Sequence, residues 1–384
     1  MTSPTLTKGP FMSRKIRIGL VGLGFGAEFI PIYQAHPDAE LVAVCQRSPE
    51  QLARIADHFG VEKRYTSYAE MLADPDIDAI HINTPIGSHA EQAVQALDAG
   101  KHVACTVPMA VTLEDCARVV EAQERSGKHY MMMETAVYTR EFLYAQDLVQ
   151  SGRLGRIQFL RGAHMQEMAG WPAYWRELPP MHYATHAVAP LLALAGAEAG
   201  TVRCVGSGSV RRDDGSGGPP FAVQSAVFTL RDSDLAMEVT RSLYDVAREY
   251  VESFDVYGSL MSYEWQQLER ESPVVFRGED GERVTVPDYA ERLPEEIRAF
   301  TTHGVYDADD NQHLSFTQGS GHGGSHPHLA HEFLSAILED RAPFPDARTA
   351  ANWTSAGICA HESAVSGREV ELPAFGHAEV EVGV

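Results

Sequence analysis

Two side chains that exchange protons, Tyr183 and His186, lie three positions apart in the sequence. Residues three apart on a helix share one face, so this spacing would bring the two side chains together. A histidine accepts or releases a proton near neutral pH, and a neighbouring tyrosine can donate or relay one. The pair has the groups for acid–base chemistry, although the spacing alone favours an amphipathic pair satisfied at a domain interface.

The apolar run His102–Cys105 predicts a short buried strand that ends in a proline-containing loop. Ligands of an open parallel sheet bind outside the carboxyl ends of its strands. We therefore expect the loop to face a bound cofactor and substrate through Thr106, Val107 and Pro108. No Lys or Arg lies between His102 and Ala117, so a proton-transferring base at this strand end must come from elsewhere.

A glycine-rich turn follows the apolar strand expected at Lys15–Val21 and matches the pattern G-x-G-x-x-A. In dinucleotide-binding domains these small residues permit a tight turn, approach of the pyrophosphate to the backbone at a helix N-terminus, and close packing of helix on strand. The pattern also occurs in turns that bind no ligand. We expect a dinucleotide site that includes Gly22, Gly24, Phe25, Gly26 and Ala27.

The end of the second expected strand, Glu40–Cys45, is where such a domain recognises the adenine ribose. An acidic residue usually binds the ribose diol of NAD there, whereas this chain has Gln46 and Arg47. Without a carboxylate, a 2′-phosphate is not repelled and Arg47 can bind it. Equally, Gln46 can bond the diol while Arg47 stacks on the adenine. From these residues the choice between NAD and NADP is therefore open.

Strands and helices alternate through the first third of the chain, which is typical of a doubly wound parallel sheet. Two more strands are expected at Ile77–Asn83 and Lys128–Met133, and helices are expected to be capped at Ser48, Ser88 and Thr112. We predict a flexible tail over residues 1–13 and a dinucleotide-binding Rossmann domain over residues 14–137.

From about Tyr138 the sequence becomes rich in strands without intervening helices, which predicts an open, mostly antiparallel sheet. The expected strands are Ile157–His164, Thr201–Val210, Ala222–Leu230, Leu235–Ser242, Tyr250–Tyr257 and Leu260–Gln266. The expected helices are Arg140–Gln150, Thr349–Val365 and Leu329–Leu338, the last with Phe333, Leu334, Ile337 and Leu338 facing inward. The predicted fold class is α/β, with residues 138–384 as a second α/β domain.

The net charge of −22 argues against nucleic acid or an anionic membrane surface as a partner. Five scattered cysteines without metal-ligand spacing fit a reducing cytoplasm. Residues 1–13 lack the apolar core of a signal peptide, and no apolar run is long enough to span a bilayer. We therefore expect a cytoplasmic protein.

Histidines gather near the C-terminus at His322, His326, His328 and His331, which raises the question of a metal site. We expect no metal, because Pro327 breaks the helical register and acidic partners are few. His322 more plausibly lies in a close-approach loop over a ligand. Aromatic residues beside Arg176, namely Trp171 and Trp175, would either stack on a sugar or pack against a neighbouring subunit.

Several motifs occur in a fixed order along most of the chain: Asn83-Thr84-Pro85 with His89, Ala99–Val103, Pro108–Ala110 and Ser151–Ile157. Together with the glycine-rich turn they resemble the glucose-fructose oxidoreductase / inositol dehydrogenase / MocA (Gfo/Idh/MocA) family. The resemblance implies the two-domain fold, sugar or polyol substrates, and a homodimer or homotetramer whose interface is often the open sheet. It also adds Thr84, Pro85 and His89 to the expected cofactor site.

One departure from this family concerns the base. Members usually carry Glu-Lys-Pro where this chain has Thr106-Val107-Pro108, and valine cannot deprotonate a hydroxyl group. Three further segments, Met132–Tyr138, Tyr183–Pro190 and Gly321–Gly324, look like the NAD-dependent α-N-acetylgalactosaminidase branch, which also lacks the lysine and to which NAD-dependent sulfoquinovosidases are related. This resemblance implies redox-neutral hydrolysis: carbon 3 is oxidised, the aglycone is eliminated, water adds, and the hydride returns.

The same resemblance implies roles for individual residues. His186 would act at the carbon 3 hydroxyl with Tyr183 assisting, and Tyr138 would be the leaving-group acid unless it is a packing residue at the hinge. Glu134 would orient the nicotinamide or a sugar hydroxyl, or else bond to backbone. An anionic glycoside such as a sulfoquinovoside would need a basic cradle, for which Arg140, Arg161, Arg176 and Arg241 are available. The alternatives are an NAD(P)-dependent pyranoside or polyol dehydrogenase and a non-catalytic dinucleotide-binding sensor.

Overall fold

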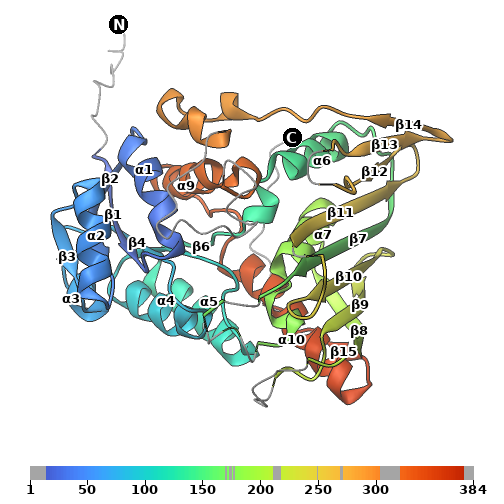
Figure 1. The fold of residues 1–384 in the computed structure, drawn as a ribbon, viewed down its shortest axis with the longest axis horizontal. Helices are drawn as coiled ribbons and strands as arrows, with labels where there is room; N and C mark the ends of the chain where they lie inside the picture. Colours follow the sequence, from blue (N-terminus) through green and yellow to red (C-terminus); the bar gives the residue numbers. More distant parts are fainter. Residues whose placement is uncertain are drawn as a thin grey trace, which may run out of the picture.

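The computed structural model describes residues 14–168, 171–172, 175, 178–210, 218–248, 250–268, 271–302 and 321–375. Two sheets dominate these residues and lie side by side (Figure 1), which confirms the α/β fold class. The boundary near residue 137 stays a prediction.

The first sheet has six parallel strands in the order β3-β2-β1-β4-β5-β6, the order of a doubly wound dinucleotide-binding domain. The strands are β1 (Ile16–Val21), β2 (Ala39–Cys45), β3 (Lys63–Tyr65), β4 (Ala79–Ile82), β5 (His102–Cys105) and β6 (Tyr130–Met132). The helices are α1 (Ile30–Ala35), α2 (Pro49–Phe59), α3 (Tyr68–Leu72), α4 (His89–Asp98) and α5 (Leu113–Ser126). Edge strand β3 was not expected, because its three residues carry no apolar alternation.

Local capping signals account for most helix starts in this half. The hydroxyls of Ser48 and Thr112 accept from the backbone N–H groups of Gln51 and Asp115, which confirms both caps. Ser88 also occupies the N-cap position of its helix, α4, but a short 3-10 turn η2 (Ile86–Ser88) precedes the helix and the Ser88 side chain makes no cap bond, so the expected capping interaction is wrong. The glycine-rich turn likewise leads into a 3-10 turn, η1 (Phe25–Phe29), before α1 begins.

The second sheet has nine strands in the order β14-β13-β12-β11-β7-β10-β9-β8-β15. Every neighbouring pair is antiparallel except β7 and β10, which are parallel, so the prediction of a mostly antiparallel sheet is confirmed. The strands are β7 (Ile157–Gln166), β8 (Ala199–Ser207), β9 (Val223–Leu230), β10 (Ala236–Ser242), β11 (Tyr250–Gly258), β12 (Ser262–Glu264), β13 (Val274–Arg277), β14 (Asp280–Arg283) and β15 (Val370–Glu371).

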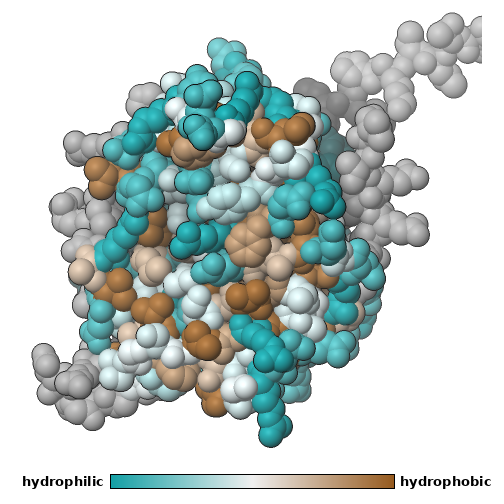
Figure 2. Space-filling view, turned by 90° about the vertical axis from the view of Figure 1, so that its right-hand side faces the viewer, coloured by the Kyte–Doolittle hydropathy of each residue, from teal (hydrophilic) through white to brown (hydrophobic). Residues whose placement is uncertain are grey.

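Helices α6 (Arg140–Gln150), α7 (Thr185–Ala195), α9 (Gly321–Glu339) and α10 (Ala347–Ser366) complete the fold, with 3-10 turns η3 (Thr135–Val137), η5 (Pro180–Tyr183), η6 (Ala290–Arg292) and η7 (Glu295–Thr301). Helix α7 corrects the prediction of an uninterrupted strand-rich run. Its residues are almost all apolar and buried, so it lacks the amphipathic pattern that marks a surface helix. Figure 2 shows the side of the molecule that carries the second sheet, where hydrophobic residues lie scattered among hydrophilic ones. Val205 and Val227 of this sheet are exposed.

The C-terminal helices join the two halves. Phe333 and Leu334 of α9 are buried in the core that contains Phe29 and Ile30 of the first half (Figure 1). Leu338 is 40% exposed, so its predicted inward orientation is wrong. Pro327 lies inside α9 and does not break it, because regular helical geometry begins only after Gly324 and a proline is tolerated in a first turn.

Candidate active site

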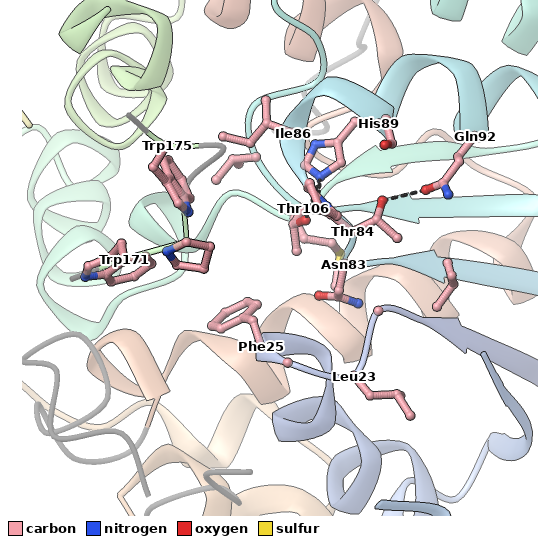
Figure 3. A pocket seen from close by; sticks show the side chains of 18 of the residues that line it. Leu23, Phe25, Asn83, Thr84, Ile86, His89, Gln92, Thr106, Trp171 and Trp175 are labelled. Carbon is pink, nitrogen blue, oxygen red and sulfur yellow. Dashed lines mark hydrogen bonds between the residues drawn. The ribbon is translucent and has the colours of Figure 1, made fainter. Parts of the chain in front are cut away.

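A cavity of about 650 Å³ lies at the carboxyl edge of the first sheet, between the two halves of the molecule. Its walls come from the turns after β1, β2, β4 and β5 on one side and from β7, β11, η5 and α7 on the other. This is the switch point of the doubly wound sheet, where strand order reverses between β1 and β4 and where such folds bind their ligands. Figure 3 shows Phe25, Asn83 and the two tryptophans around this space.

The glycine-rich turn fits a dinucleotide. Gly22 has a φ of +87°, and a Cβ added there would lie 2.3 Å from the carbonyl oxygen of Asn83. A Cβ at Gly26 would lie 2.9 Å from the Asn83 side chain, whereas one at Gly24 would meet no atom within 4 Å. Gly22 and Gly26 therefore let β1 and β4 approach, and Gly24 leaves its backbone open to a ligand.

Asn83 itself carries a second sign of a ligand. Both polar atoms of its buried amide lack a hydrogen-bond partner within the described part of the chain, although the side chain lines the cavity. Buried amides are rarely left unpaired, because desolvation without a partner costs about 1–3 kcal/mol. A bound dinucleotide would supply both a donor and an acceptor here.

Substitution of Gly22 and of Gly24 is expected to affect different properties, stability in the first case and dinucleotide affinity in the second. Gly22→Ala is expected to lower the free energy of unfolding by about 1–3 kcal/mol through backbone strain and the clash with Asn83. Gly24→Ala is expected to leave stability near wild type but to weaken dinucleotide binding, since its methyl group projects into open space. Thermal unfolding and titration of NADH fluorescence measure the two effects. A Gly24→Ala protein that binds NADH as tightly as wild type would contradict the assignment.

The other expected cofactor residues divide into cavity-lining and supporting positions. Phe25, Gln46, Arg47, Thr84, Pro85, His89, Thr106 and Val107 line the cavity, whereas Gly26, Ala27 and Pro108 lie behind its surface. His89 holds the loops after β4 and β5 together, with Nε2 2.7 Å from the Thr84 carbonyl oxygen and Nδ1 2.8 Å from that of Pro108. The side chain therefore fixes the spacing of the two loops that the cofactor would cross.

His186 lies at the opposite end of the cavity, next to Tyr183 and Glu134. Its Nδ1 is 2.6 Å from Glu134 Oε1, and its Nε2 is 3.2 Å from the Tyr183 hydroxyl. Tyr183 is the last residue of η5 and His186 lies in the first turn of α7, so the expected contact is present although one continuous helix does not carry both. The carboxylate fixes the ring and leaves Nε2 directed toward Tyr183 and the cavity.

The electrostatics of His186 follow from buried charges around it. Burial lowers the pKa of the imidazole, but the carboxylates of Glu134 and Glu252 outweigh burial and hold the pKa above its ordinary value. Glu134 is completely buried and also accepts from the Ala136 N–H at 3.0 Å. It therefore positions His186 and makes the backbone bond that the sequence left open as the alternative. Glu134 is not among the residues that line the cavity, and its contact with nicotinamide or sugar stays a prediction.

Four polar residues near His186 were missed from the sequence: His164 and Gln166 on β7, and Tyr250 and Glu252 on β11. Glu252 is paired with His164 across the two strands, and Tyr250 with Gln166. Their signal was present, because polar residues occupy alternate positions of strands that are otherwise buried on that face.

These residues form a second proton-exchanging group. Glu252 Oε1 accepts a hydrogen bond from the Tyr250 hydroxyl and lies 3.8 Å from His164 Nε2 and 4.0 Å from His186 Nε2. Burial and the charge of Arg241 hold the pKa of His164 well below its ordinary value, so its ring is neutral at pH 7. Neither ring nitrogen of His164 has a hydrogen-bond partner within the described ranges, although the ring lines the cavity.

Arg241 supports this wall from behind. It is fully buried and donates to the carbonyl oxygens of Tyr183 at 2.7 Å and His164 at 3.0 Å, and to Gln166 Oε1 at 2.9 Å. Arg140 donates to the backbone of residues 301 and 323, and Arg161 is exposed on β7. The structure therefore does not gather these three arginines into a cradle, and Arg176 lies outside the described residues.

Tyr138 does not fit the predicted leaving-group acid. Its hydroxyl donates to the Phe344 carbonyl oxygen at 2.7 Å, and Tyr138 is not among the residues that line the cavity. Burial raises its pKa well above the ordinary value. Tyr138 is a packing residue at the junction of the two halves, the alternative that the sequence left open.

The predicted substrate residues Trp171, Trp175 and His322 all line the cavity, and Figure 3 shows the two tryptophans across from Phe25. Their rings are 5.6 Å apart and nearly perpendicular. His322 has a φ of 45°, and its ring lies 6.3 Å from that of His186. Contact with a sugar stays a prediction for all three residues.

Within the described residues, no group of three or more His, Cys, Asp or Glu side chains is placed to hold a metal ion. None of the described helices is both long enough and apolar enough to cross a membrane.

Comparisons with known proteins agree with this geometry. Residues 16–134 match a family model, GFO_IDH_MocA, described as an oxidoreductase family with an NAD-binding Rossmann fold. A glycosyl hydrolase family 109 protein of Shewanella baltica is 32% identical over 198 residues, which are 46% of this chain and 43% of that protein. An alpha-N-acetylgalactosaminidase of Shewanella oneidensis is 30% identical over 198 residues, with the same coverage of 46% and 43%. The matched segment thus spans less than half the length of these curated relatives.

Solved structures share the whole fold at low sequence identity. Levoglucosan dehydrogenase in complex with NADH has a TM-score of 0.79 and 22% identity, over 94% of this chain and 100% of that one. Aldose-aldose oxidoreductase from Caulobacter crescentus, complexed with glycerol, has a TM-score of 0.72 and 18% identity, over 94% and 100%. At these identities the likeness establishes the fold.

Proposed function

We propose that this chain, whose residues 16–134 are the NAD-binding Rossmann domain of a Gfo/Idh/MocA oxidoreductase, is an NAD-dependent enzyme acting on sugars. We propose further that it is a redox-neutral glycoside hydrolase. The observation that carries the proposal is the buried chain Glu134–His186–Tyr183 at the sugar end of a cavity whose strand-end loop holds Val107 in place of a base. The similarity to glycosyl hydrolase family 109 proteins supports it.

Oxidation is the first step, and His186 is its base. Bound NAD supplies a hydride acceptor at the start of the cycle and a hydride donor at its end. Nε2 of His186 takes the proton of the carbon 3 hydroxyl, directly or through Tyr183, as the hydrogen on carbon 3 departs as hydride. Glu134 stabilises the imidazolium that results, because its carboxylate lies 2.6 Å from Nδ1.

Elimination requires a second proton-transfer group. Once carbon 3 is a ketone, the proton on carbon 2 is acidic, and its removal expels the aglycone from carbon 1, which takes up a proton. Tyr250 lines the cavity with its hydroxyl bonded to ionised Glu252, and neutral His164 lies beside them. We assign the second transfer to this group in place of Tyr138. Water then adds its hydroxyl to carbon 1 and a proton to carbon 2. Finally, hydride returns to carbon 3 and a proton returns to the oxygen on carbon 3.

The described walls favour an uncharged sugar. Arg47, at the dinucleotide end, supplies the only Arg or Lys side chain among the described residues that line the cavity. Histidine, tyrosine, glutamine and tryptophan side chains at the other end bind hydroxyl groups and sugar faces. An anionic glycoside such as a sulfoquinovoside would have to draw its cation from residues outside the described ranges.

A deuterium experiment tests the proposed chemistry. In D₂O with NAD and a panel of aryl glycosides, neutral and anionic, we expect aglycone release without accumulation of NADH, and one deuterium at carbon 2 of the sugar product. Mass spectrometry locates the label and absorbance follows NADH.

The rival activity is net oxidation by a pyranoside or polyol dehydrogenase, which His186 and Glu134 could also serve. Stoichiometric NADH without cleavage of the glycosidic bond would establish the dehydrogenase and reject the glycosidase. Failure to bind any nicotinamide dinucleotide would reject both activities, whereas dinucleotide binding with neither activity would favour the sensor.

A further inference from the structure

The dinucleotide cavity carries an unusual charge pattern where β2 ends. The residues that line it there are Cys45, Gln46, Arg47, Gln51, Thr66 and Tyr68. None of these side chains is a carboxylate, although an Asp or Glu at this strand end is what binds the ribose diol of NAD and repels a 2′-phosphate. Glu70 is close enough to act on the Cys45 thiol, but it is exposed and does not line the cavity.

The sequence left two arrangements open for Gln46 and Arg47. In one, Gln46 binds the ribose diol and Arg47 stacks on the adenine; in the other, Arg47 binds a 2′-phosphate. The structure ties Gln46 to α2, because its Nε2 donates to Gln51 Oε1 at 2.5 Å. Gln51 is in turn fixed by the Ser48 cap, whose hydroxyl accepts from the Gln51 N–H. Gln46 thus keeps a neutral carbonyl acceptor, sufficient for one ribose hydroxyl, and adds no negative charge.

Arg47 has the freedom that a phosphate ligand needs. It is exposed at the rim of the cavity, and within the described ranges its guanidinium makes no hydrogen bond or ion pair. The nearby Arg64, by contrast, is paired with Asp57 at 2.7 Å. A free guanidinium presents a planar fork of donors that matches phosphate geometry, which a lysine or an amide does not.

We propose that this site accepts a 2′-phosphate on Arg47, so that the protein binds NADP(H) as well as NAD(H). Gln46 binds the ribose diol of NAD(H) and does not repel the 2′-phosphate of NADP(H). The inference concerns the adenosine end of the cavity and stands whether or not the sugar end performs the proposed hydrolysis.

Equilibrium binding tests this selectivity without any turnover. Titrations of wild-type protein with NADH and NADPH, followed by cofactor fluorescence, are expected to give Kd values within about tenfold of each other. Arg47→Ala is expected to weaken NADPH at least tenfold and NADH less than threefold, because only NADPH carries the phosphate. Gln46→Asp is expected to weaken NADPH more than NADH by introducing a like charge. Displacement of bound NADPH by 2′,5′-ADP and by ADP compares the affinity for the 2′-phosphate without any contribution from the nicotinamide.

Arg203→Ala is the matched control, since it removes the same charge from a surface ion pair with Glu369 on the second sheet. It is expected to leave both Kd values unchanged. NADPH binding more than a hundredfold weaker than NADH in wild type would overturn the proposal. So would equal weakening of both cofactors in Arg47→Ala, which indicates adenine stacking. If neither cofactor binds, this proposal and the proposed function fail together, whereas normal binding without glycoside cleavage rejects only the latter.

Discussion

Replacing His186 by alanine is expected to lower kcat by about 10²–10⁴-fold, the range by which a positioned acid–base group accelerates proton transfer. Dinucleotide affinity should stay within about twofold of wild type, because His186 lies on α7 of the second half and is not part of the glycine-rich turn. His186→Gln, which keeps a polar side chain of similar length, should be impaired to a similar degree, since an amide cannot carry the proton. Steady-state kinetics with a cleaved aryl glycoside and NADH titration measure the two quantities.

The control for this substitution is His129→Ala. His129 is another partly buried histidine, stacked on His102 at a ring distance of 5.0 Å, and it does not line the cavity. Its loss should leave turnover within about twofold of wild type. Turnover by His186→Ala at the wild-type rate, with the protein folded, would remove His186 from the mechanism.

Glu134→Gln is expected to shift the pH profile as well as the rate. The carboxylate helps to hold the pKa of His186 above its ordinary value, so its neutralisation lowers that pKa. A base must be unprotonated to act, and the acidic limb of kcat/KM should therefore move to lower pH. The rate at the optimum should fall by about 10²–10⁴-fold, because an amide can hold the wrong tautomer and cannot stabilise an imidazolium.

Glu252→Gln tests whether the effect of a carboxylate on the pKa of His186 depends on its distance from the ring. Glu252 Oε1 lies 4.0 Å from His186 Nε2, whereas Glu134 Oε1 lies 2.6 Å from Nδ1. The acidic limb should move in the same direction in Glu252→Gln, by a smaller amount. An acidic limb unchanged in Glu134→Gln, with a lower rate alone, would mean that Glu134 supports the fold and does not set the proton affinity of His186.

The first sheet could be predicted almost completely because its signals are local. Apolar runs of strand length, side-chain caps at Ser48 and Thr112, and the glycine at position 22 each act within a few residues. The second half was predicted less well where those signals fail. Helix α7 is apolar on all sides. Strands β13 to β15 have four residues or fewer, and β14 is fully exposed.

The candidate site shows the same division. His186 and Tyr183 were found because they lie close in the sequence, whereas Glu252 and His164 were missed because two strands bring them together. Tyr138 belongs to a motif that resembles a catalytic one, yet its hydroxyl faces Phe344. A sequence motif identifies which residues are present, but it does not determine where their side chains point, because that depends on the residues packed around them.

The sequence by itself determined that a dinucleotide site follows the first strand, and that no lysine stands at position 107 to act as a base. Both are matters of residue identity and local backbone geometry. Only the tertiary structure decided which charges surround His186, because Glu134 at the end of β6 and His186 on α7 are 52 residues apart and meet only when the two halves pack. The carboxylates of Glu134 and Glu252 then raise the proton affinity of His186 against the opposing effect of burial, since a charge removed from water responds most strongly to the nearest opposite charge.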